Sequence, residues 1–213
     1  MLRIVLILFV SCFAFSASAH QPEFPEPKNV NDILNVENFN LSRAYYGELV
    51  GFPHVFAVDV TERQPLFLEI LLPDIEPVEY KPSVIIVRKE KRGVSEVARM
   101  LPASGSWVSF REPFGNDKYL RGLSYEEELE PGNYLVEVST ATGYGKYVLV
   151  VGKEEKFSIW NYFSLVSDIA RVKRFYGKSS FRAIESPLVF VPVLILVSSL
   201  WFWHYRRKQK QNA

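Results

Sequence analysis

Histidine is the residue type in this sequence best suited to chemistry, and it occurs three times, as His20, His54 and His204. If an export leader ends at Ala19, the α-amine and imidazole of His20 would chelate copper, with His54 as a third nitrogen ligand. Nitrogen ligands suit Cu(II) well. The other interpretation is a solvated N-terminus at His20 and a turn histidine on the surface at His54. A copper-binding protein or enzyme is therefore one hypothesis for this chain.

Hydrolytic chemistry has less support. A Ser-His-Asp arrangement would have to use His54, and no serine stands in a Gly-x-Ser-x-Gly turn. The one cysteine of the chain, Cys12, lies in an apolar stretch near the N-terminus. We therefore predict no catalytic residue and expect a protein that is not an enzyme.

Two acidic runs raise the question of calcium. Glu126 to Glu128 with Glu130 form one run, and Asp74, Glu76 and Glu79 form the other. The ligand spacing of a calcium loop is absent from both, and acidic runs are usually solvated faces. The main expectation is that the protein has no cofactor, with calcium and copper as the alternatives.

Aromatic residues surround the segment Gly115-Asn116, where Asp117 adds a carboxylate. Exposed aromatic rings stack on sugars or on partner proteins, although a tryptophan on a sandwich strand more often belongs to the core. The candidate partner-binding residues are Trp107, Phe114, Asp117 and Tyr119.

Residues 1–19 have the three parts of a secretory signal peptide. Arg3 supplies a short positive region, an apolar run follows from Ile4 to Phe15, and Ala17-Ser18-Ala19 forms a cleavage site. The alternative is an anchor helix that is not cleaved. Because cleavage removes Cys12, the exported chain would have no disulfide, and its core alone must stabilise it.

A second apolar stretch, residues 188–205, has 18 residues without one Asp, Glu, Lys or Arg. At 1.5 Å per residue it makes about 27 Å of helix, close to the roughly 30 Å of a hydrocarbon core. Aromatic residues at one end and basic residues directly after them are typical of a span with a cytoplasmic tail. These boundary residues are Trp201, Trp203, Tyr205, Arg206, Arg207 and Lys208. We predict one transmembrane helix over residues 187–205 and a basic tail over 206–213; the alternative is a buried helix of a soluble protein.

The part between the two apolar ends divides by charge. Residues 20–156 carry 15 basic and 22 acidic side chains, and residues 157–186 carry 5 basic and 2 acidic ones. The prediction is an acidic extracytoplasmic body on a basic collar, in a single-pass cell-membrane protein. Residues 20–42 are assigned to an extended arm, because the first ten contain three prolines and little periodicity, and those ten are not expected in the core.

From Arg43 onward the apolar pattern has the short period of strands. Strands are expected over residues 43–50, 54–60, 65–72, 83–88, 107–110, 133–139 and 146–151, with a further one over 119–129. Strands without helices between them predict an all-β fold, an antiparallel jelly-roll-like β-sandwich over residues 43–156. Residues 94–101 are the exception, because their apolar spacing is helical. The sequence is compatible there with a short helix or with a loop.

Residues 157–175 change to a helical period, with basic residues gathered at the end. This amphipathic helix either packs on the sandwich or lies on the outer leaflet with its basic groups on lipid phosphates. The segment Gly177-Lys178-Ser179-Ser180 is expected to be a hinge before the span, within a juxtamembrane region of residues 157–186.

Two segments carry a resemblance to a known family. Leu129 to Gly152 reads LEPGNYLVEVSTATGYGKYVLVVG, and Tyr45 to Leu72 holds an element ending in Gly, a turn, a strand and an apolar strand. They resemble the closing and opening strands of bacterial pre-peptidase C-terminal domains, which end in an L-x-P-G-x-Y hairpin entry and a G-x-Y-x-L strand. The resemblance covers about residues 43–152. It implies a non-catalytic accessory module, although this chain lacks a protease domain and ends in a membrane span.

The turn Pro131-Gly132-Asn133-Tyr134 gives that resemblance a physical reason. Gly132 is expected to supply a positive φ, and Tyr134 to enter the next strand with its ring inward and its hydroxyl on a loop carbonyl.

These observations predict a membrane-anchored extracytoplasmic binding or assembly module that presents its sandwich to an envelope or membrane protein or to a glycan. No nucleic-acid partner is expected. The alternatives are the copper protein built on His20 and His54, and a purely structural envelope protein, whose ectodomain would have no well-formed pocket.

Overall fold

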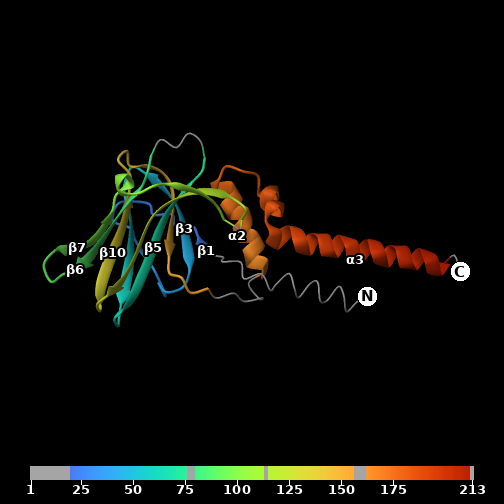
Figure 1. Ribbon diagram of the computed structural model, residues 1–213, viewed down its shortest axis with the longest axis horizontal. Helices are drawn as coiled ribbons and strands as arrows, with labels where there is room; N and C mark the ends of the chain where they lie inside the picture. Colours follow the sequence, from blue (N-terminus) through green and yellow to red (C-terminus); the bar gives the residue numbers. More distant parts are fainter. Residues whose placement is uncertain (1–19, 76–79, 113–114, 156–161, 212–213) are drawn as a thin grey trace. The chain divides into compact units, whose positions relative to one another are not determined.

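The computed structural model describes residues 20–75, 80–112, 115–155 and 162–211 (Figure 1). The predicted signal peptide with Cys12 lies outside these residues. The described chain forms two compact units. Residues 20–112 and 118–155 make up the first, the sandwich unit, and residues 115–117 and 162–211 make up the second, the C-terminal unit.

The sandwich unit consists of two β-sheets. The six-stranded sheet has the order β1-β3-β11-β5-β9-β8, and the five-stranded sheet has the order β2-β4-β10-β6-β7. The first contains β1 (Gln21–Glu23), β3 (Arg43–Val50), β5 (Gln64–Pro73), β8 (Val108–Arg111), β9 (Lys118–Leu129) and β11 (Tyr144–Val151). The second contains β2 (Ile33–Asn35), β4 (His54–Val60), β6 (Ser83–Lys89), β7 (Val94–Met100) and β10 (Gly132–Ser139). A short 3-10 helix, η1 (Pro102–Ser104), precedes β8.

The mostly-β prediction is confirmed, and the strands expected from the sequence are present at nearly the same bounds. In β4, for example, Phe56, Val58 and Val60 are buried while the alternate residue Asp59 is exposed. This alternation is what a strand with one buried face requires. Among the described strand pairs seven are antiparallel, and two, β1 with β3 and β2 with β4, are parallel.

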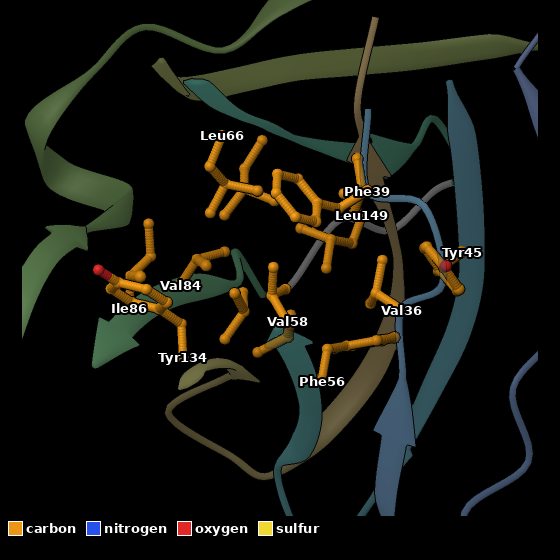
Figure 2. Close-up of a cluster of buried hydrophobic side chains, with 14 of the residues drawn as sticks. Val36, Phe39, Tyr45, Phe56, Val58, Leu66, Val84, Ile86, Tyr134 and Leu149 are labelled. Carbon is orange, nitrogen blue, oxygen red and sulfur yellow. The ribbon is translucent and has the colours of Figure 1, made fainter. Parts of the chain in front are cut away.

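The core lies between the two sheets. Figure 2 shows Leu66 and Leu149 of the six-stranded sheet in one cluster with Phe56, Val58 and Ile86 of the five-stranded sheet. All five side chains are fully buried. Burying one such side chain stabilises a fold by about 1.5–3 kcal/mol, so a cluster of this size holds the unit together through apolar contact.

The N-terminal segment contributes to the sandwich unit. Gln21 to Glu23 form β1 beside β3, in the extended backbone that the prolines predicted. Further along, β2 pairs with β4, and Val36 and Phe39 are buried in the core cluster. The sandwich unit therefore includes residues before Arg43, because the apolar residues after the prolines fill space between the sheets.

Residues 94–100, where the sequence left a helix or a loop open, are strand β7 instead. This strand pairs with β6 at the edge of the five-stranded sheet, and its register shifts between Ile86 and Val87. Most of its side chains are exposed. Because β7 has no continuous buried face, its sequence has no reason to alternate, and its pairing with β6 decides its structure.

The turn before β10 confirms one expectation and corrects another. Tyr134 is buried, and its hydroxyl donates a hydrogen bond to the carbonyl of Glu130 at 2.7 Å, as predicted. Gly132 is not among the residues with positive φ; it lies in the strand, opposite Val60. Positive φ is required at Gly152 instead, at +76°, where an added Cβ would lie 2.5 Å from the carbonyl oxygens of Phe39 and Leu41.

The C-terminal unit contains α2 (Tyr162–Phe175), η3 (Ser180–Glu185) and α3 (Pro187–Gln211) (Figure 1). Gly177, at φ +68°, ends α2 in a Schellman motif: its N–H donates to Arg174 O, and the N–H of Lys178 donates to Lys173 O. The predicted hinge over residues 177–180 is therefore a capped turn. The helix start predicted at 157 lies outside the described residues.

Helix α3 is apolar enough to cross a membrane by length and composition. Its first residue is Pro187, a position at which proline is favoured because no intrahelical donor is lost. Within Pro187–Gln209, an 18-residue window has a mean hydropathy of 1.8, and only 6% of that window is buried. The helix continues past the predicted end at 205 through the basic tail. It accommodates Pro192 in its interior.

Candidate functional site

A groove of about 610 Å³ opens beside the five-stranded sheet. Four elements of the sheet and the loop after β2 line it. Its polar side chains are Asn35 of β2, Glu37 and Asn38 of the loop, Asp59 of β4, Lys89 of β6 and Asn133 of β10. Its volume lies within the range of 300–1,000 Å³ that is usual for ligand pockets.

The polar side chains of the groove are available to a ligand. Within the described chain, no hydrogen bond or ion pair joins these six side chains to each other or to other residues. Two carboxylates and one ammonium give the lining a net negative charge. Carboxamide and carboxylate groups bind hydroxyls and amines, so the groove suits a hydrophilic ligand better than an apolar one.

His54 opens strand β4, as predicted, but it is buried, with only 2% of its surface exposed. Its Nδ1 and the hydroxyl of Tyr147 are hydrogen-bonded at 2.7 Å, and the two rings meet edge-on. Nε2 is buried and has no hydrogen-bond partner in the part of the chain that is described. Burial lowers the pKa of His54 and raises the pKa of Tyr147, so both side chains are neutral near pH 7.

His20 lies in a different part of the sandwich unit. Its Nδ1 is hydrogen-bonded to the hydroxyl of Ser42, and burial lowers its pKa. The next residue, Gln21, is opposite Arg43 of β3, whereas Tyr147, the partner of His54, is opposite Gly47 of the same strand. Four residues of β3 span about 13 Å. The structure therefore does not bring His20 and His54 together as ligands of one copper ion.

The acidic runs that suggested calcium are spread out. Glu126 pairs with Lys153 at 2.5 Å, and both Glu128 and Glu130 face Arg63 at 3.5 and 3.6 Å. Glu127 points to the other face of β9, since neighbouring side chains of a strand alternate. Glu76 and Glu79 lie outside the described residues. Within the described residues, no three His, Cys, Asp or Glu side chains are placed to hold a metal ion.

The candidate partner-binding residues are mostly buried. The indole N–H of Trp107 donates to the carbonyl of Pro102 at 3.3 Å, and its ring packs against the core. Tyr119 is buried, with its hydroxyl 3.0 Å from that of Tyr46. Asp117 is also fully buried, and Phe114 lies outside the described residues. The expectation of an exposed aromatic loop is thus corrected for Tyr119, which is buried in the sandwich unit, whereas Trp107 is only partly buried.

Asp117 instead belongs to a buried charged cluster in the C-terminal unit. Lys173 of α2, also fully buried, lies 3.0 and 3.1 Å from the two carboxylate oxygens of Asp117. Its ammonium also donates to the carbonyl of Gly115 at 2.6 Å and approaches Glu185 at 3.5 Å. Lys178 adds a second bond to Asp117 at 2.7 Å. Two cations and two carboxylates thus tie residues 115–117 to α2 and η3.

The six predicted membrane-boundary residues all lie on α3. Trp201, Trp203 and Tyr205 are exposed, and the rings of Trp201 and Tyr205 stack at 5.8 Å. The guanidinium of Arg207 lies 3.8 Å from the ring of Trp203. Their exposure suits rings in a headgroup layer, where one part is apolar and the other polar.

Sequence reasoning missed the groove and the charged cluster. Period-two alternation identifies Asp59 and Asn133 as outward-facing residues, but it does not show that they are neighbours. The partner of Lys173 is 56 residues away in the sequence. No local pattern contained that signal.

No family model matches the sequence, and the search among curated proteins gives no match. Solved structures do match in part. The pre-peptidase C-terminal domain of a collagenase from Bacillus anthracis matches with 12% identity and a TM-score of 0.35, over 60% of this chain and 97% of that one. The resemblance predicted from the sequence thus recurs in the structural comparison.

Two further structures are similar at the same level. PliG, a periplasmic inhibitor of g-type lysozyme from Aeromonas hydrophila, has 10% identity and a TM-score of 0.37, over 62% of this chain and 97% of that one. CorA, a surface-associated copper-binding protein of Methylomicrobium album BG8, has 7% identity and a TM-score of 0.31, over 58% and 98%. The class that the described residues define is a two-sheet β protein with a helix apolar enough to span a membrane.

Proposed function

We propose that this protein is a membrane-anchored, non-catalytic binding or assembly module whose sandwich unit lies outside the cytoplasm. The observation that carries the proposal is an apolar 18-residue window of α3, within Pro187–Gln209, of which only 6% is buried by the rest of the chain. Exposed apolar surface of this extent is unfavourable in water, and contact with lipid removes it from water.

The orientation follows from the charges beside the span. Arg206, Arg207 and Lys208 directly follow the aromatic end of α3. Basic residues at one end of a span favour the cytoplasmic side. The sandwich unit then lies on the opposite side, in agreement with the signal peptide predicted over residues 1–19.

We also infer a jelly-roll connectivity for the sandwich unit. Without the short strands β1, β2 and β8, the two sheets have the orders β3-β11-β5-β9 and β4-β10-β6-β7. The chain alternates between the sheets from β3 to β6 and again from β9 to β11, as two interleaved Greek keys require.

The groove beside the five-stranded sheet is the binding surface in this proposal. Its polar lining, with a net negative charge, supports a hydrophilic ligand, either a glycan or a polar segment of an envelope protein. A purely structural envelope protein has no need of such a groove, and this favours a binding role.

The anchor is tested in native membranes. The full chain should stay in the membrane pellet after an alkaline wash, and protease added outside should digest the sandwich unit while a C-terminal epitope stays protected. Leu196→Arg, which places a charge in the middle of α3, should move the protein to the soluble fraction. Recovery of the wild-type chain in the soluble fraction would contradict the proposal.

The groove is tested by cross-linking and co-purification from the same membranes, with binding to isolated envelope polysaccharide measured in parallel. Asp59→Arg reverses a charge in the groove and should abolish capture of whichever partner the wild-type chain retains. Glu62→Arg is the matched control, because Glu62 is exposed and lies outside the groove. Equal capture by both variants would exclude the groove as the binding surface.

A further inference from the structure

The most exposed large apolar side chain in the described part of the chain is Phe181, with 91% of its surface exposed. It lies in the 3-10 helix η3, together with Ile184, which is 43% exposed. In a 3-10 helix the side chains at positions i and i+3 eclipse each other, so these two residues share one face. Ala183, one residue away, is buried. The turn thus presents one apolar face outward.

This face has a fixed shape. The hydroxyl of Ser179 accepts a hydrogen bond from the backbone N–H of Phe181 at 3.4 Å. Arg174 of α2 donates to the hydroxyl of Ser180 at 2.9 Å. Arg182 donates to Glu185 at 2.6 Å. These bonds hold η3 in place within the C-terminal unit, so the exposure of Phe181 belongs to an ordered turn.

The apolar face of η3 is continuous with the proposed span. Ile184 and Phe181 precede Pro187, the first residue of α3, by three and six residues. Even a fully extended chain, at about 3.6 Å per residue, places them at most about 11 and 22 Å from the span. The 18 uncharged residues 188–205 make about 27 Å of helix, a few ångströms less than a hydrocarbon core of roughly 30 Å. A short span draws the residues that flank it towards the core.

The charge of the region around η3 also favours contact with lipid. Residues 157–186 carry five basic and two acidic side chains, whereas residues 20–156 carry an excess of acidic ones. Lys173 is buried, and the other four basic side chains, Arg171, Arg174, Lys178 and Arg182, are at least partly exposed. Anionic lipid headgroups attract basic segments and repel acidic ones. The region around η3 is therefore the part of the chain outside α3 whose charge suits a bilayer surface.

We propose that Phe181 and Ile184 insert into the interfacial layer of the bilayer on the side where α3 begins, as a second contact with lipid. This inference rests on the proposed anchoring by α3. Aromatic and aliphatic side chains beside a basic group are the combination that interfacial segments use. The effect is to fix the depth of η3 at the membrane surface.

The test places an environment-sensitive fluorophore on single cysteines in the full chain, with Cys12→Ser removing the natural thiol. Phe181→Cys reports on η3, Leu196→Cys on the middle of α3, and Val94→Cys on an exposed apolar position of β7. The chain is reconstituted in vesicles of phosphatidylethanolamine and phosphatidylglycerol. Quenching by iodide in the water is compared with quenching by a lipid-attached nitroxide. All three positions are exposed in the structure, so labelling leaves the fold intact.

We expect labels at 181 and 196 to be quenched by the lipid nitroxide and several-fold less by iodide than the label at 94. Iodide quenching at 181 equal to that at 94, with 196 in lipid, would overturn the inference and leave the anchor standing. If the label at 196 is itself quenched by iodide, the anchoring fails, and the inference fails with it. Protection at 181 from both quenchers would mean that a protein surface covers η3, and would also overturn it.

Discussion

The sandwich unit and the C-terminal unit bury different kinds of side chain. Between the sheets the buried cluster is aliphatic and aromatic, from Val36 to Val151. The C-terminal unit buries the ion pair of Lys173 and Asp117, both fully covered. Eleven strands in the described residues supply two broad apolar faces, whereas α2 and η3 are short and supply little apolar area, and most of α3 is exposed. Charged groups in that smaller unit satisfy one another instead.

The difference has an energetic consequence. Apolar burial is favourable for each side chain by itself and tolerates small changes of geometry. A buried ion pair loses its hydration on both sides and is stable only when both partners are present. We therefore expect the sandwich unit to respond to the size of a substituted side chain, and the C-terminal unit to respond to its charge.

The largest effect is expected from Phe56→Ala. Phe56 is fully buried between the sheets, and removal of its ring leaves a cavity that should lower the free energy of unfolding of the sandwich unit by about 4–5 kcal/mol. Val55→Ala, on the other face of β4, should cost about 1 kcal/mol or less. Urea unfolding followed by circular dichroism at the β-sheet band measures both. Equal losses would mean that the core is not where the structure places it.

Asp117→Asn should have the next largest effect. It removes the carboxylate that faces both Lys173 and Lys178, and leaves a buried ammonium without its closest counter-charge. Breaking a buried pair costs about 3 kcal/mol or more. Hydrogen exchange of the α2 amides should accelerate, while that of the sandwich strands stays unchanged.

A double variant tests whether the loss in Asp117→Asn comes from the unpaired charge of Lys173. Lys173→Met combined with Asp117→Asn should recover part of the lost protection, because the lone charge is then removed as well. Lys178→Met should cost less than Asp117→Asn, since its side chain is 29% exposed. If the α2 amides exchange faster in the double variant than in either single variant, the loss is due to packing and not to charge.

Tyr147→Phe tests the buried polar contact between Tyr147 and His54 in the sandwich unit. It keeps the ring and removes the hydroxyl that bonds His54 Nδ1, which leaves both ring nitrogens of His54 unpaired among the described residues. The expected loss is about 2 kcal/mol. Tyr134→Phe, which loses a bond to the Glu130 carbonyl near the surface, should cost about half as much.

The smallest effect is a pH dependence confined to the sandwich unit. Burial lowers the pKa of His54, so the unfolded chain takes up a proton below about pH 6.5 while the folded chain does not. The free energy of unfolding should therefore fall as the pH falls below 6.5, and His54 contributes at most about 1.4 kcal/mol per pH unit to this slope.

His54→Gln should reduce this slope, and His20→Gln should reduce it separately, because burial lowers the pKa of His20 as well. The readout is the urea midpoint of the sandwich unit between pH 5 and pH 7. An unchanged slope in both variants would show that neither histidine is buried in the neutral form.

Much of the fold could be predicted from the sequence, and little of the site. Strands such as His54–Val60 and the helix from Pro187 were predictable, because alternation and the absence of charge are visible in a short window. Strand β7 was not predictable, since it is an exposed edge without a buried face. Burial of His54 and Asp117 was also hidden, because a polar residue in a loop or at a strand end looks the same in sequence whether or not it meets a partner.

The sequence by itself determined the positions of most strands along the chain, the apolar stretch of α3 and the uneven distribution of charge, since each depends on residues near one another in the chain. Only the tertiary structure decided that Asp59 and Asn133 line one groove, and that Asp117 meets Lys173. These contacts depend on strand register and on the packing of segments that are distant in the sequence. The free energy that selects them comes from the packing of the whole unit and is not present in any single window of sequence.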